Sequence, residues 1–432
     1  MPRTTALRAL SACRRNGAWS DAVLRDCIAE AKLDSRDAAL CTTLCCGVLQ
    51  NRALLDYYID LLLTGRKRLH PALREILELG AYQILFLDRV PDSAAVNEAV
   101  AQAKCRLSRQ EAGLCNGLLR NLCRRKEELE PPRDYAVRYS HPPALVDLMK
   151  QSVGKQLGVI LEADNANPET CAIWNPLRCE EAELLSAWEK EGVRVARHSW
   201  KQHCYLLRGT GDLRQLPSFE NGMFQIQDAA ARLSVEAMGL QPGMEVLDLC
   251  AAPGGKSLAA AQIMENRGTI LACDLHEGKL TQIESAARRL GVSIVSAQVN
   301  DATVLREDWL KRFDAVIADV PCSGLGVIRK KPDIRYKDTG EMQMLPALQR
   351  SILNRAGEYV KPGGVLLYST CTILRRENED VVRAFLSDHA SFRKEQFPLP
   401  PGLAEEETGM LTLYQGVNDC DGFFLCRMRK QI

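Results

Sequence analysis

One stretch of this 432-residue chain constrains its fold more than any other, and it lies at residues 246–257. An apolar run at 246–249 leads through Gly254-Gly255 into an Ala-rich segment. That order is typical of a buried strand, a tight glycine turn and the start of a helix. Such a turn leaves backbone N–H groups facing the space beyond the strand, so the stretch predicts a binding loop for a ligand.

From residue 246 onward, predicted strands and helices alternate, which indicates a Rossmann-like, doubly wound α/β sheet. The expected strands are residues 246–250, 269–273, 293–299, 315–318 and 365–368. The expected helices are residues 257–264, 279–290 and 346–359. A late pair of strands, 392–397 and 422–428, is expected to form an antiparallel hairpin at the sheet edge.

Residues that follow the predicted strands are candidate site residues, because ligands of open α/β sheets bind beyond the carboxyl ends of the strands. Asp274 ends the second strand and Asp301 follows the third. Asp319 and Cys322 follow the fourth strand, and Cys371 follows the fifth. The sequence therefore predicts that acids and two thiols meet at one edge of the sheet.

The glycine loop alone does not identify its ligand. It matches neither Gly-x-Gly-x-x-Gly nor Gly-x-x-x-x-Gly-Lys-Ser, which are typical of NAD and ATP sites. Asp274 lies 19 residues after Gly255, where a nucleotide-binding α/β fold places a carboxylate for ribose hydroxyls. The alternative is that Asp274 caps a helix. A loop of amides combined with a ribose-binding acid suits a small nucleoside that carries a carboxylate, such as S-adenosylmethionine.

Cysteine usage indicates reduced thiols. The chain has 17 cysteines and no Cys-x-x-Cys, so we expect neither a disulfide framework nor a metal site. Most cysteines are expected in the core, including Cys250 and Cys273, which fall in predicted strands. Neither a signal peptide nor a stretch near the ~18 apolar residues of a membrane span is recognised. We expect a soluble, cytoplasmic protein without a membrane partner.

Cys322 and Cys371 differ from the other cysteines because they lie at the rim of the predicted site. Carbon 5 of cytosine is too weak a nucleophile to attack a methyl sulfonium, but addition of a thiolate to carbon 6 makes it reactive. Asp319 is placed to stabilise the accompanying charge shift near ring nitrogen 3. A second group must remove the carbon 5 proton before the thiol can leave. Two thiols therefore suit one nucleophile and one group that assists release.

The N-terminal region, residues 1–130, shows apolar residues at helical spacing and no strand-like alternation, which predicts an all-α domain. Ser93 and Ser108 are possible helix N-caps. Residues 1–139 contain 22 Lys and Arg against 17 Asp and Glu, with basic clusters at 66–68 and at 120–126. Such clusters are either solvated helix ends or contacts for RNA phosphates. A small α+β subdomain is expected at 140–224, where His141 is interpreted as a structural turn residue, and the α/β domain at 225–432.

Three motifs carry a resemblance to a known family. They are Asp-Leu-Cys-Ala-Ala-Pro-Gly-Gly-Lys-Ser from 248, Asp-Val-Pro-Cys-Ser-Gly-Leu-Gly from 319, and Tyr-Ser-Thr-Cys-Thr from 368 with Glu377-Asn378-Glu379. They resemble the RsmB (Sun/Fmu) family of RNA 5-methylcytosine methyltransferases. The N-terminal region is similar to NusB-type RNA-binding domains in Arg3-Thr4-Thr5-Ala6-Leu7, Ala81-Tyr82-Gln83-Ile84-Leu85, Asn97-Glu98-Ala99-Val100 and Asn116-Gly117-Leu118-Leu119-Arg120. Together these likenesses span essentially the whole chain.

The resemblance implies specific roles. Cys371 would attack carbon 6 and Cys322 would assist release, whereas DNA-acting relatives use the Pro-Cys thiol as the nucleophile. Asp319 and Lys256 would lie near the target base. The S-adenosylmethionine site would comprise Cys250, Ala251, Ala252, Pro253, Gly254, Gly255, Lys256, Asp274, Asp301 and Asp319. The implied substrate is 16S rRNA at cytosine 967 of the family's rRNA numbering, with the protein acting as a monomer and without DNA.

Two other functions remain open from the sequence. The same chemistry on tRNA fits the catalytic motifs equally well. A non-catalytic RNA-binding factor fits the NusB-like region, although the cofactor and thiol motifs argue against it.

Overall fold

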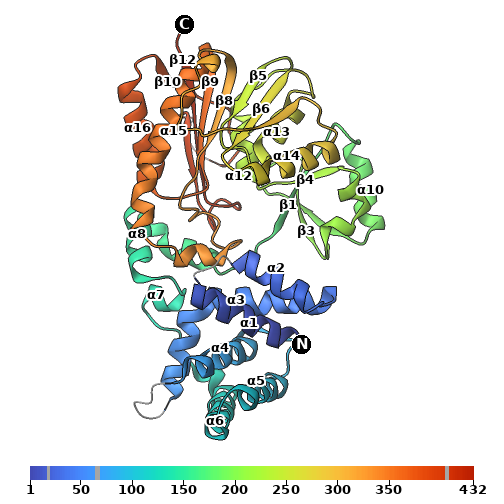
Figure 1. Ribbon diagram of the computed structural model, residues 1–432, viewed down its shortest axis with the longest axis vertical. Coiled ribbons are helices and arrows are strands. Elements are labelled where there is room, and N and C mark those ends of the chain that lie inside the picture. The colour runs from blue at the N-terminus through green and yellow to red at the C-terminus, as the bar shows by residue number, and fades with distance from the viewer. Residues whose placement is uncertain (17–19, 64–68, 404–407) are drawn as a thin grey trace. The chain divides into compact units, whose positions relative to one another are not determined.

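The computed structural model describes residues 1–16, 20–63, 69–403 and 408–432, which divide into two compact units (Figure 1). The first, called the helical unit, comprises Met1–Lys150, Leu161–Ala166 and Ile328–Lys337. The second, called the sheet unit, comprises Gln151–Ile160, Asn167–Val327 and Asp338–Ile432. The helical unit therefore includes a short segment that follows the Pro-Cys motif in the chain.

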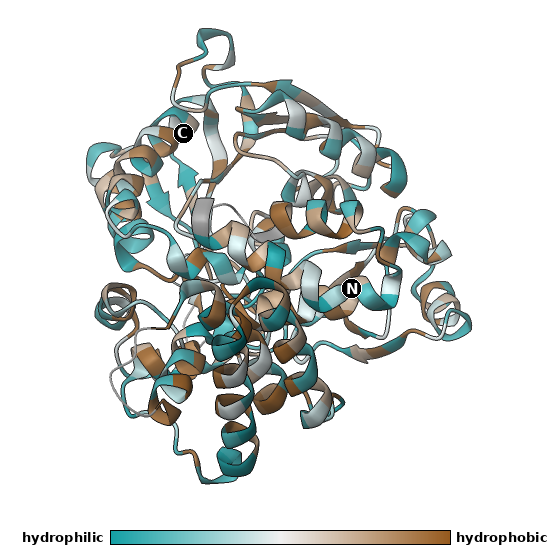
Figure 2. Ribbon diagram, turned by 60° about the horizontal axis from the view of Figure 1, so that its bottom comes forward, coloured by the Kyte–Doolittle hydropathy of each residue, from teal (hydrophilic) through white to brown (hydrophobic). Residues whose placement is uncertain are grey.

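The helical unit is built from amphipathic helices around one apolar core, as the 3.6-residue spacing predicts. Buried residues such as Leu44, Val48, Ile76 and Leu119 form that core, and Figure 2 shows apolar and hydrophilic residues alternating along the helices. The helices are α1 (Pro2–Asn16), α2 (Ser20–Glu30), α3 (Ser35–Leu62), α4 (Pro71–Phe86), α5 (Asp92–Arg106), α6 (Arg109–Arg125), η1 (Lys126–Glu128), α7 (Tyr135–Arg138) and η5 (Pro332–Tyr336). The division between the units passes through α8 (Pro143–Val153) and α9 (Leu157–Ala163), which flank η2 (Gly154–Gln156).

Two predicted caps have different outcomes. Ser108 caps α6 in a capping box with Glu111, so this prediction is confirmed. The prediction for Ser93 is wrong, because α5 already begins at Asp92 behind Pro91 and has no side-chain cap. Pro91 is itself the N-cap residue, so the boundary lies two residues earlier than predicted.

The helix α3 corrects the expectation that no stretch approaches the length of a membrane span. Among the described residues it alone is long and apolar enough, with a mean hydropathy of 1.3 over 18 residues. However, 56% of that window is buried inside the structure, as in the core helix of a soluble protein. Cys41, Leu44 and Leu55 of this helix are fully buried. Length and composition are therefore weak evidence for a membrane span here.

The basic clusters are only partly described. Residues 66–68 lie outside the described residues. In the second cluster, Arg120 and Arg124 are exposed on α6, while Lys126 pairs with Asp92 at 3.1 Å. RNA binding by this surface remains a prediction.

The large sheet of the sheet unit confirms the predicted doubly wound α/β fold. Its strand order is β10-β12-β9-β8-β5-β6-β7, with β11 paired to β12. Neighbours from β9 to β7 are parallel, and β12 joins β9 antiparallel. The strands are β5 (Glu245–Asp248), β6 (Thr269–Asp274), β7 (Val295–Val299), β8 (Phe313–Asp319), β9 (Val360–Thr370), β10 (Phe392–Lys394), β11 (Met410–Leu413) and β12 (Phe423–Lys430). The expected late antiparallel pair is β10 and β12, while β11 was not expected.

Helices cover both faces of the large sheet (Figure 1). Successive strand residues point to opposite faces, so Val246 packs with Leu258 on one side while Leu247 packs with Leu353 on the other. The helices are α12 (Ala229–Glu236), α13 (Gly255–Ile263), α14 (Glu277–Leu290), α15 (Leu345–Tyr359) and α16 (Glu379–Asp388), with η4 (Glu307–Trp309), η6 (Glu341–Met344) and η7 (Arg375–Glu377). This double cover leaves the carboxyl ends of the parallel strands as the place for a ligand.

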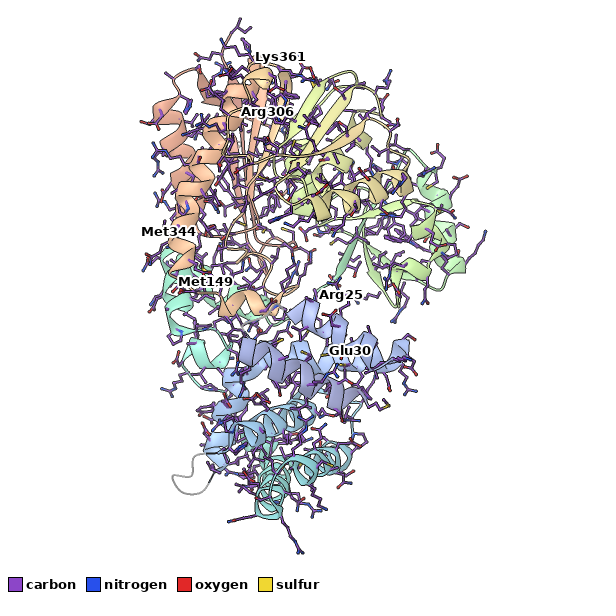
Figure 3. All side chains as sticks on the ribbon, in the orientation of Figure 1. Arg25, Glu30, Met149, Arg306, Met344 and Lys361 are labelled. Atoms are coloured by element: carbon purple, nitrogen blue, oxygen red, sulfur yellow. The ribbon has the colours of Figure 1, made fainter. Side chains whose placement is uncertain are left out.

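Surface ion pairs lie away from the carboxyl ends of the parallel strands. Lys361 at the start of β9 contacts Asp314 at the start of β8, with 2.8 Å between Nζ and Oδ1. Arg306, also labelled in Figure 3, pairs with Asp308 at 3.0 Å. These partly exposed pairs contribute little stability. The pair of Lys361 and Asp314 marks the amino ends of β9 and β8.

A smaller antiparallel sheet of order β2-β3-β1-β4 belongs to the same unit. It contains β1 (Thr170–Trp174), β2 (Arg194–Arg197), β3 (Cys204–Arg208) and β4 (Phe224–Ile226), with α10 (Glu181–Lys190), α11 (Pro217–Glu220) and η3 (Leu213–Gln215). Strand β4 was not expected. His141 lies in the helical unit instead, where its ring contacts the Tyr139 carbonyl oxygen at 2.7 Å and Asp164 at 3.2 Å. It is buried, in keeping with a structural residue.

Candidate functional site

The loop between β5 and α13 forms the floor of the site. Its turn is made by Gly254, which adopts a φ of +103° directly before α13. Glycine is required there, because a side chain disfavours that φ and a Cβ would lie 3.3 Å from Ile283. The turn directs the first N–H groups of α13 toward the sheet edge, as the glycine pair predicts.

Buried hydrogen bonds hold this loop. Gln225 and Gln227 each donate their side-chain amide to the Gly255 carbonyl oxygen, at 2.9 and 3.0 Å. Ser257 donates its hydroxyl to Asp248 at 2.7 Å. Burial raises the pKa of Asp248 to about 7. Cys250 lies after β5 rather than within it, which corrects the expectation that it is a strand residue.

A pocket of about 170 Å³ opens beside the loop, at the ends of β5, β6 and β7. It is lined by Leu249, Cys250, Asp274, Leu275, His276, Lys279, Asn300, Asp301, Ala302, Thr303, Pro321, Leu348 and Ile352. Predicted residues Cys250, Asp274 and Asp301 thus come together. Ala251 to Lys256 and Asp319 do not line this pocket.

The two acids of the pocket are positioned by local backbone contacts. Asp274 ends β6 and accepts a hydrogen bond from the His276 N–H at 3.1 Å. His276, not Asp274, is the N-cap residue of α14, so the helix-cap alternative is wrong. Asp301 accepts from the Thr303 N–H and hydroxyl, which lower its pKa.

These residues fit S-adenosylmethionine. Carboxylates at the ends of β6 and β7 can accept hydrogen bonds from ribose hydroxyls. The apolar side chains of Leu275, Leu348 and Ile352 offer a slot for a purine ring. The first N–H groups of α13 can receive a carboxylate. No sequence signal had pointed to Leu275 or Leu348, because single exposed leucines are common on any surface.

The two predicted thiols meet at the ends of the neighbouring strands β8 and β9. Cys322 Sγ and Cys371 Sγ are 3.3 Å apart, and both side chains are half-buried. Strand pairing places Asp319 opposite Ser369. The adjacency of β8 and β9 therefore brings together residues 49 positions apart in the chain.

Asp319 and Lys256 form an ion pair beside these thiols. The distance from Lys256 Nζ to Asp319 Oδ2 is 2.5 Å, and Ser369 donates its hydroxyl to Oδ1 at 2.8 Å. The Lys256 ammonium also lies 5.0 Å from the centre of the Phe423 ring. All four predicted catalytic residues thus occupy one small region, while the supporting roles of Ser369 and Phe423 were not predicted.

The two thiols have opposite acidities. The pKa of Cys371 is lowered, chiefly by the hydrogen bond with Cys322, and the charge of Lys256 lowers it further. The pKa of Cys322 is raised well above its ordinary value by the same hydrogen bond, by burial and by nearby negative charges. The thiolate therefore forms on Cys371 first, and thiolates are the nucleophilic form of cysteine.

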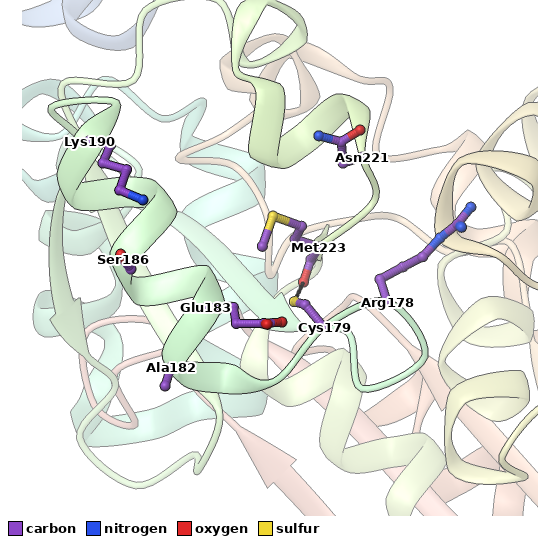
Figure 4. A pocket seen from close by; sticks show the side chains of 8 residues that line it. All are labelled: Arg178, Cys179, Ala182, Glu183, Ser186, Lys190, Asn221 and Met223. Atoms are coloured by element: carbon purple, nitrogen blue, oxygen red, sulfur yellow. Dashed lines mark hydrogen bonds between the residues drawn. The ribbon is translucent and has the colours of Figure 1, made fainter.

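A second, more open hollow of about 560 Å³ lies on the smaller sheet's subdomain (Figure 4). It is lined by Arg178, Cys179, Ala182, Glu183, Ser186, Lys190, Asn221 and Met223. It shares no residue with the first pocket and contains none of the residues predicted for the site.

Comparisons with known proteins agree with this geometry. The family model described as 16S rRNA methyltransferase RsmB/F matches residues 235–429, and that of the NusB family matches residues 1–124. "Probable ribosomal RNA small subunit methyltransferase B" of Bacillus subtilis (strain 168) is 35% identical, over 99% of this chain and 98% of the relative. The chain belongs to the ribosomal RNA small subunit methyltransferase B family.

Other members and structures are similar over much of the chain. The family's enzyme from Serratia proteamaculans (strain 568) is 32% identical, over 92% of each chain. The crystal structure of a methyltransferase homolog protein from Pyrococcus horikoshii is 29% identical, covers 69% of this chain and 98% of its own, and superposes with a TM-score of 0.60. The predicted Rossmann-like fold, NusB-like region and S-adenosylmethionine cofactor are confirmed for this methyltransferase family.

Proposed function

We propose that the protein methylates carbon 5 of a cytosine in 16S rRNA, at position 967 of the family's rRNA numbering, through a transient bond between Cys371 Sγ and carbon 6. The observation that supports this most is the pair of thiols 3.3 Å apart beside the Lys256–Asp319 ion pair. One nucleophile, one second thiol and one charge-stabilising pair are what this reaction needs.

The first step uses the lowered pKa of Cys371. Its thiolate adds to carbon 6, so the S–C6 bond forms and electron density moves through the ring toward nitrogen 3. Lys256 holds a proton 2.5 Å from the Asp319 carboxylate. Transfer of that proton through Asp319 to nitrogen 3 neutralises the charge that builds on the ring. Carbon 5 becomes enamine-like and nucleophilic.

The second step restores the ring. When bound, S-adenosylmethionine supplies the methyl group that ends on carbon 5, and Cys250, Asp274 and Asp301 would hold it with the loop from Ala251 to Lys256. The carbon 5 proton then leaves and its electron pair forms the C5=C6 double bond. The S–C6 bond breaks with its electron pair returning to Cys371, and the nitrogen 3 proton returns through Asp319 to Lys256.

Cys322 suits the removal of the carbon 5 proton. The Cys371 hydrogen bond is the first cause of the raised pKa of Cys322, and the charge of Cys371 is another. Both disappear once Cys371 is bonded to carbon 6. The pKa of Cys322 then falls, so Cys322 releases its proton to solvent more readily and becomes the thiolate that can accept the carbon 5 proton at the stage when a base is needed.

The remaining parts have supporting roles. We assign RNA docking to the NusB-like region, residues 1–130, and expect the small subdomain at 140–224 and the methyltransferase domain at 225–432 to act as one cytoplasmic monomer. The exposed Arg120 and Arg124 on α6 suit contacts with RNA phosphates.

The decisive experiment is transfer of labelled methyl from S-adenosylmethionine to unmodified 16S rRNA, compared with unmodified tRNA, followed by mapping of the methylated nucleotide. We expect incorporation at carbon 5 of one cytosine in the rRNA. Incorporation into tRNA alone would mean that the substrate is tRNA and not 16S rRNA. Absence of S-adenosylmethionine binding would favour a non-catalytic RNA-binding factor.

Cysteine variants test the mechanism separately. Cys371→Ala is expected to abolish methyl transfer, and retention of full activity would contradict the covalent mechanism. Cys322→Ala is expected to trap enzyme on RNA as a covalent adduct, seen as a band resistant to denaturation. Loss of activity without an adduct would argue against its role in release.

A further inference from the structure

Two adjacent buried residues, Glu377 and Asn378, form hydrogen bonds that hold the loops of the two site cysteines. Glu377 is the last residue of η7, Asn378 directly precedes α16, and both are fully buried. Neither touches the pocket, and neither has a part in the mechanism above. Their hydrogen bonds are nevertheless directed at the two cysteine loops.

Glu377 and its partner Gln349 fix the loop of Cys322. Glu377 Oε2 accepts from the Ser323 N–H at 2.9 Å and from Gln349 Nε2 at 2.9 Å. The same Gln349 amide donates to the Pro321 carbonyl oxygen at 3.0 Å. The peptide groups before and after Cys322 are thus both bonded to one buried pair.

Asn378 fixes the loop of Cys371 in the same way. Its Oδ1 accepts from the Thr370 hydroxyl at 2.6 Å, and its Nδ2 donates to the Thr372 carbonyl oxygen at 2.9 Å. The hydroxyls of Ser323 and Thr372 lie 2.7 Å apart and join the two loops directly.

This arrangement bears on the distance between the thiols. Buried hydrogen bonds to a charged or amide group are costly to break, so they restrict the backbone more than exposed ones do. A reacting pair displaced by about 1 Å can lose about 100-fold in rate. In addition, the negative charge of Glu377 is one of the lesser causes that raise the pKa of Cys322, after the Cys371 hydrogen bond and burial.

We propose that Glu377 and Asn378 are positioning residues that form a clamp and set the separation of the Cys322 and Cys371 thiols. The consequence for catalysis rests on the proposed function. The separation itself belongs to the folded sheet unit and can be measured without RNA or cofactor.

Phenylarsine oxide measures the spacing directly. It reacts with two neighbouring thiols to form two As–S bonds and releases one water, without oxidation. In the full-length protein, the cross-link between the peptides of Cys322 and Cys371 is quantified by mass spectrometry, and Cys322→Ala gives the background. We expect Glu377→Ala and Asn378→Asp to slow this reaction at least tenfold, the aspartate because its second oxygen would face the Thr372 carbonyl. Unchanged rates in both variants would overturn the clamp.

Two further variants separate positioning from folding. Glu379→Gln is the matched control, because Glu379 is adjacent and bonded to Thr412 rather than to a cysteine loop. It is expected to react like the unmodified protein. Glu377→Gln keeps an acceptor for Ser323 and should restore most of the cross-linking rate lost in Glu377→Ala, which a general folding defect would not predict. Equal loss in both Glu377 variants would contradict positioning by these hydrogen bonds.

Activity assays then distinguish the clamp from the proposed function. If the unmodified protein methylates rRNA, Asn378→Asp is expected to lower kcat at least tenfold with little change in KM for S-adenosylmethionine. If it methylates no RNA, the proposed function fails, while the rate of cross-linking by phenylarsine oxide still tests the clamp. If methylation proceeds and the variants cross-link normally, the clamp alone fails.

Discussion

At the scale of single residues, the difference in pKa between the two thiols decides which of them acts as the nucleophile. Cys322 lies in a Pro-Cys-Ser motif and Cys371 in a Thr-Cys-Thr motif. Their difference in pKa arises because they share one hydrogen bond, and because Lys256 acts on Cys371 while negative charges surround Cys322. The neighbouring strand therefore sets the reactivity, not the motif alone.

The pH dependence of alkylation tests this division. Modification of Cys371 by iodoacetamide, followed by peptide mass spectrometry, is expected to reach half of its maximal rate below the pH typical of a free cysteine, because its pKa is lowered. Cys322→Ala removes the largest cause of that shift, so the midpoint should move to higher pH. The exposed Cys105 provides an internal reference in the same protein. A midpoint unaffected by Cys322→Ala would contradict the shared hydrogen bond.

At the scale of elements, the Pro-Cys loop is held where it leaves the sheet. The Gly326 N–H donates to the Cys371 carbonyl oxygen, and the Gly422 N–H donates to the Gly326 carbonyl oxygen, both at 2.9 Å. A Cβ on Gly326 would lie 1.9 Å from the Gly422 carbonyl oxygen. The close approach of these backbones leaves no space for a side chain.

Gly326→Ala is therefore expected to displace the loop and to reduce methyl transfer at least tenfold. Overpacking of this kind costs about 1–3 kcal/mol of stability, which thermal unfolding can detect. Gly113→Ala is the control, because no atom lies within 4 Å of its Cβ position. Alanine should stabilise α6 there by about 0.5–1 kcal/mol. Equal effects of the two substitutions would refute the steric explanation.

Local patterns predicted most of the strands and missed two short ones, β4 and β11. β6 and β8 follow long apolar runs, and the strand before Gly254-Gly255, β5, was evident from the order of residues. β4 has three residues and β11 four, too few for an alternation to be visible. The partner of β4 is β1, which lies about 50 residues earlier in the chain, so pairing rather than local preference makes β4 a strand.

The sequence predicted those site residues that directly follow a recognisable strand. Asp274, Asp301 and both cysteines lie at the expected sheet edge because parallel strands end together. The 3.3 Å separation of the thiols and the part of Gln349 were not predictable. They depend on contacts across 28 to 49 residues, and a glutamine within a helix gives no local signal of its partners.

At the scale of the whole molecule, the chain does not divide into consecutive domains. The segment Ile328–Lys337 belongs to the helical unit although its neighbours on both sides belong to the sheet unit. Its residue Arg335 is fully buried. The guanidinium donates to backbone carbonyl oxygens of Gln50, Tyr139, Ser140, Asp164 and Pro332, and to the side-chain oxygen of Asn165. One side chain thus joins four separate stretches of that unit.

Arg335→Met should therefore destabilise the helical unit strongly. The variant leaves several buried carbonyl groups without a donor, and each such loss costs about 1–3 kcal/mol. A total near 3 kcal/mol would lower the melting temperature of a unit of this size by roughly 6–12 °C. Arg8→Met, which removes an exposed pair with Glu30, is expected to leave the melting temperature nearly unchanged. Differential scanning calorimetry of both full-length variants measures the difference, and S-adenosylmethionine binding by the sheet unit should survive in each. An unchanged melting temperature in Arg335→Met would mean that the segment 328–337 is not anchored through this guanidinium.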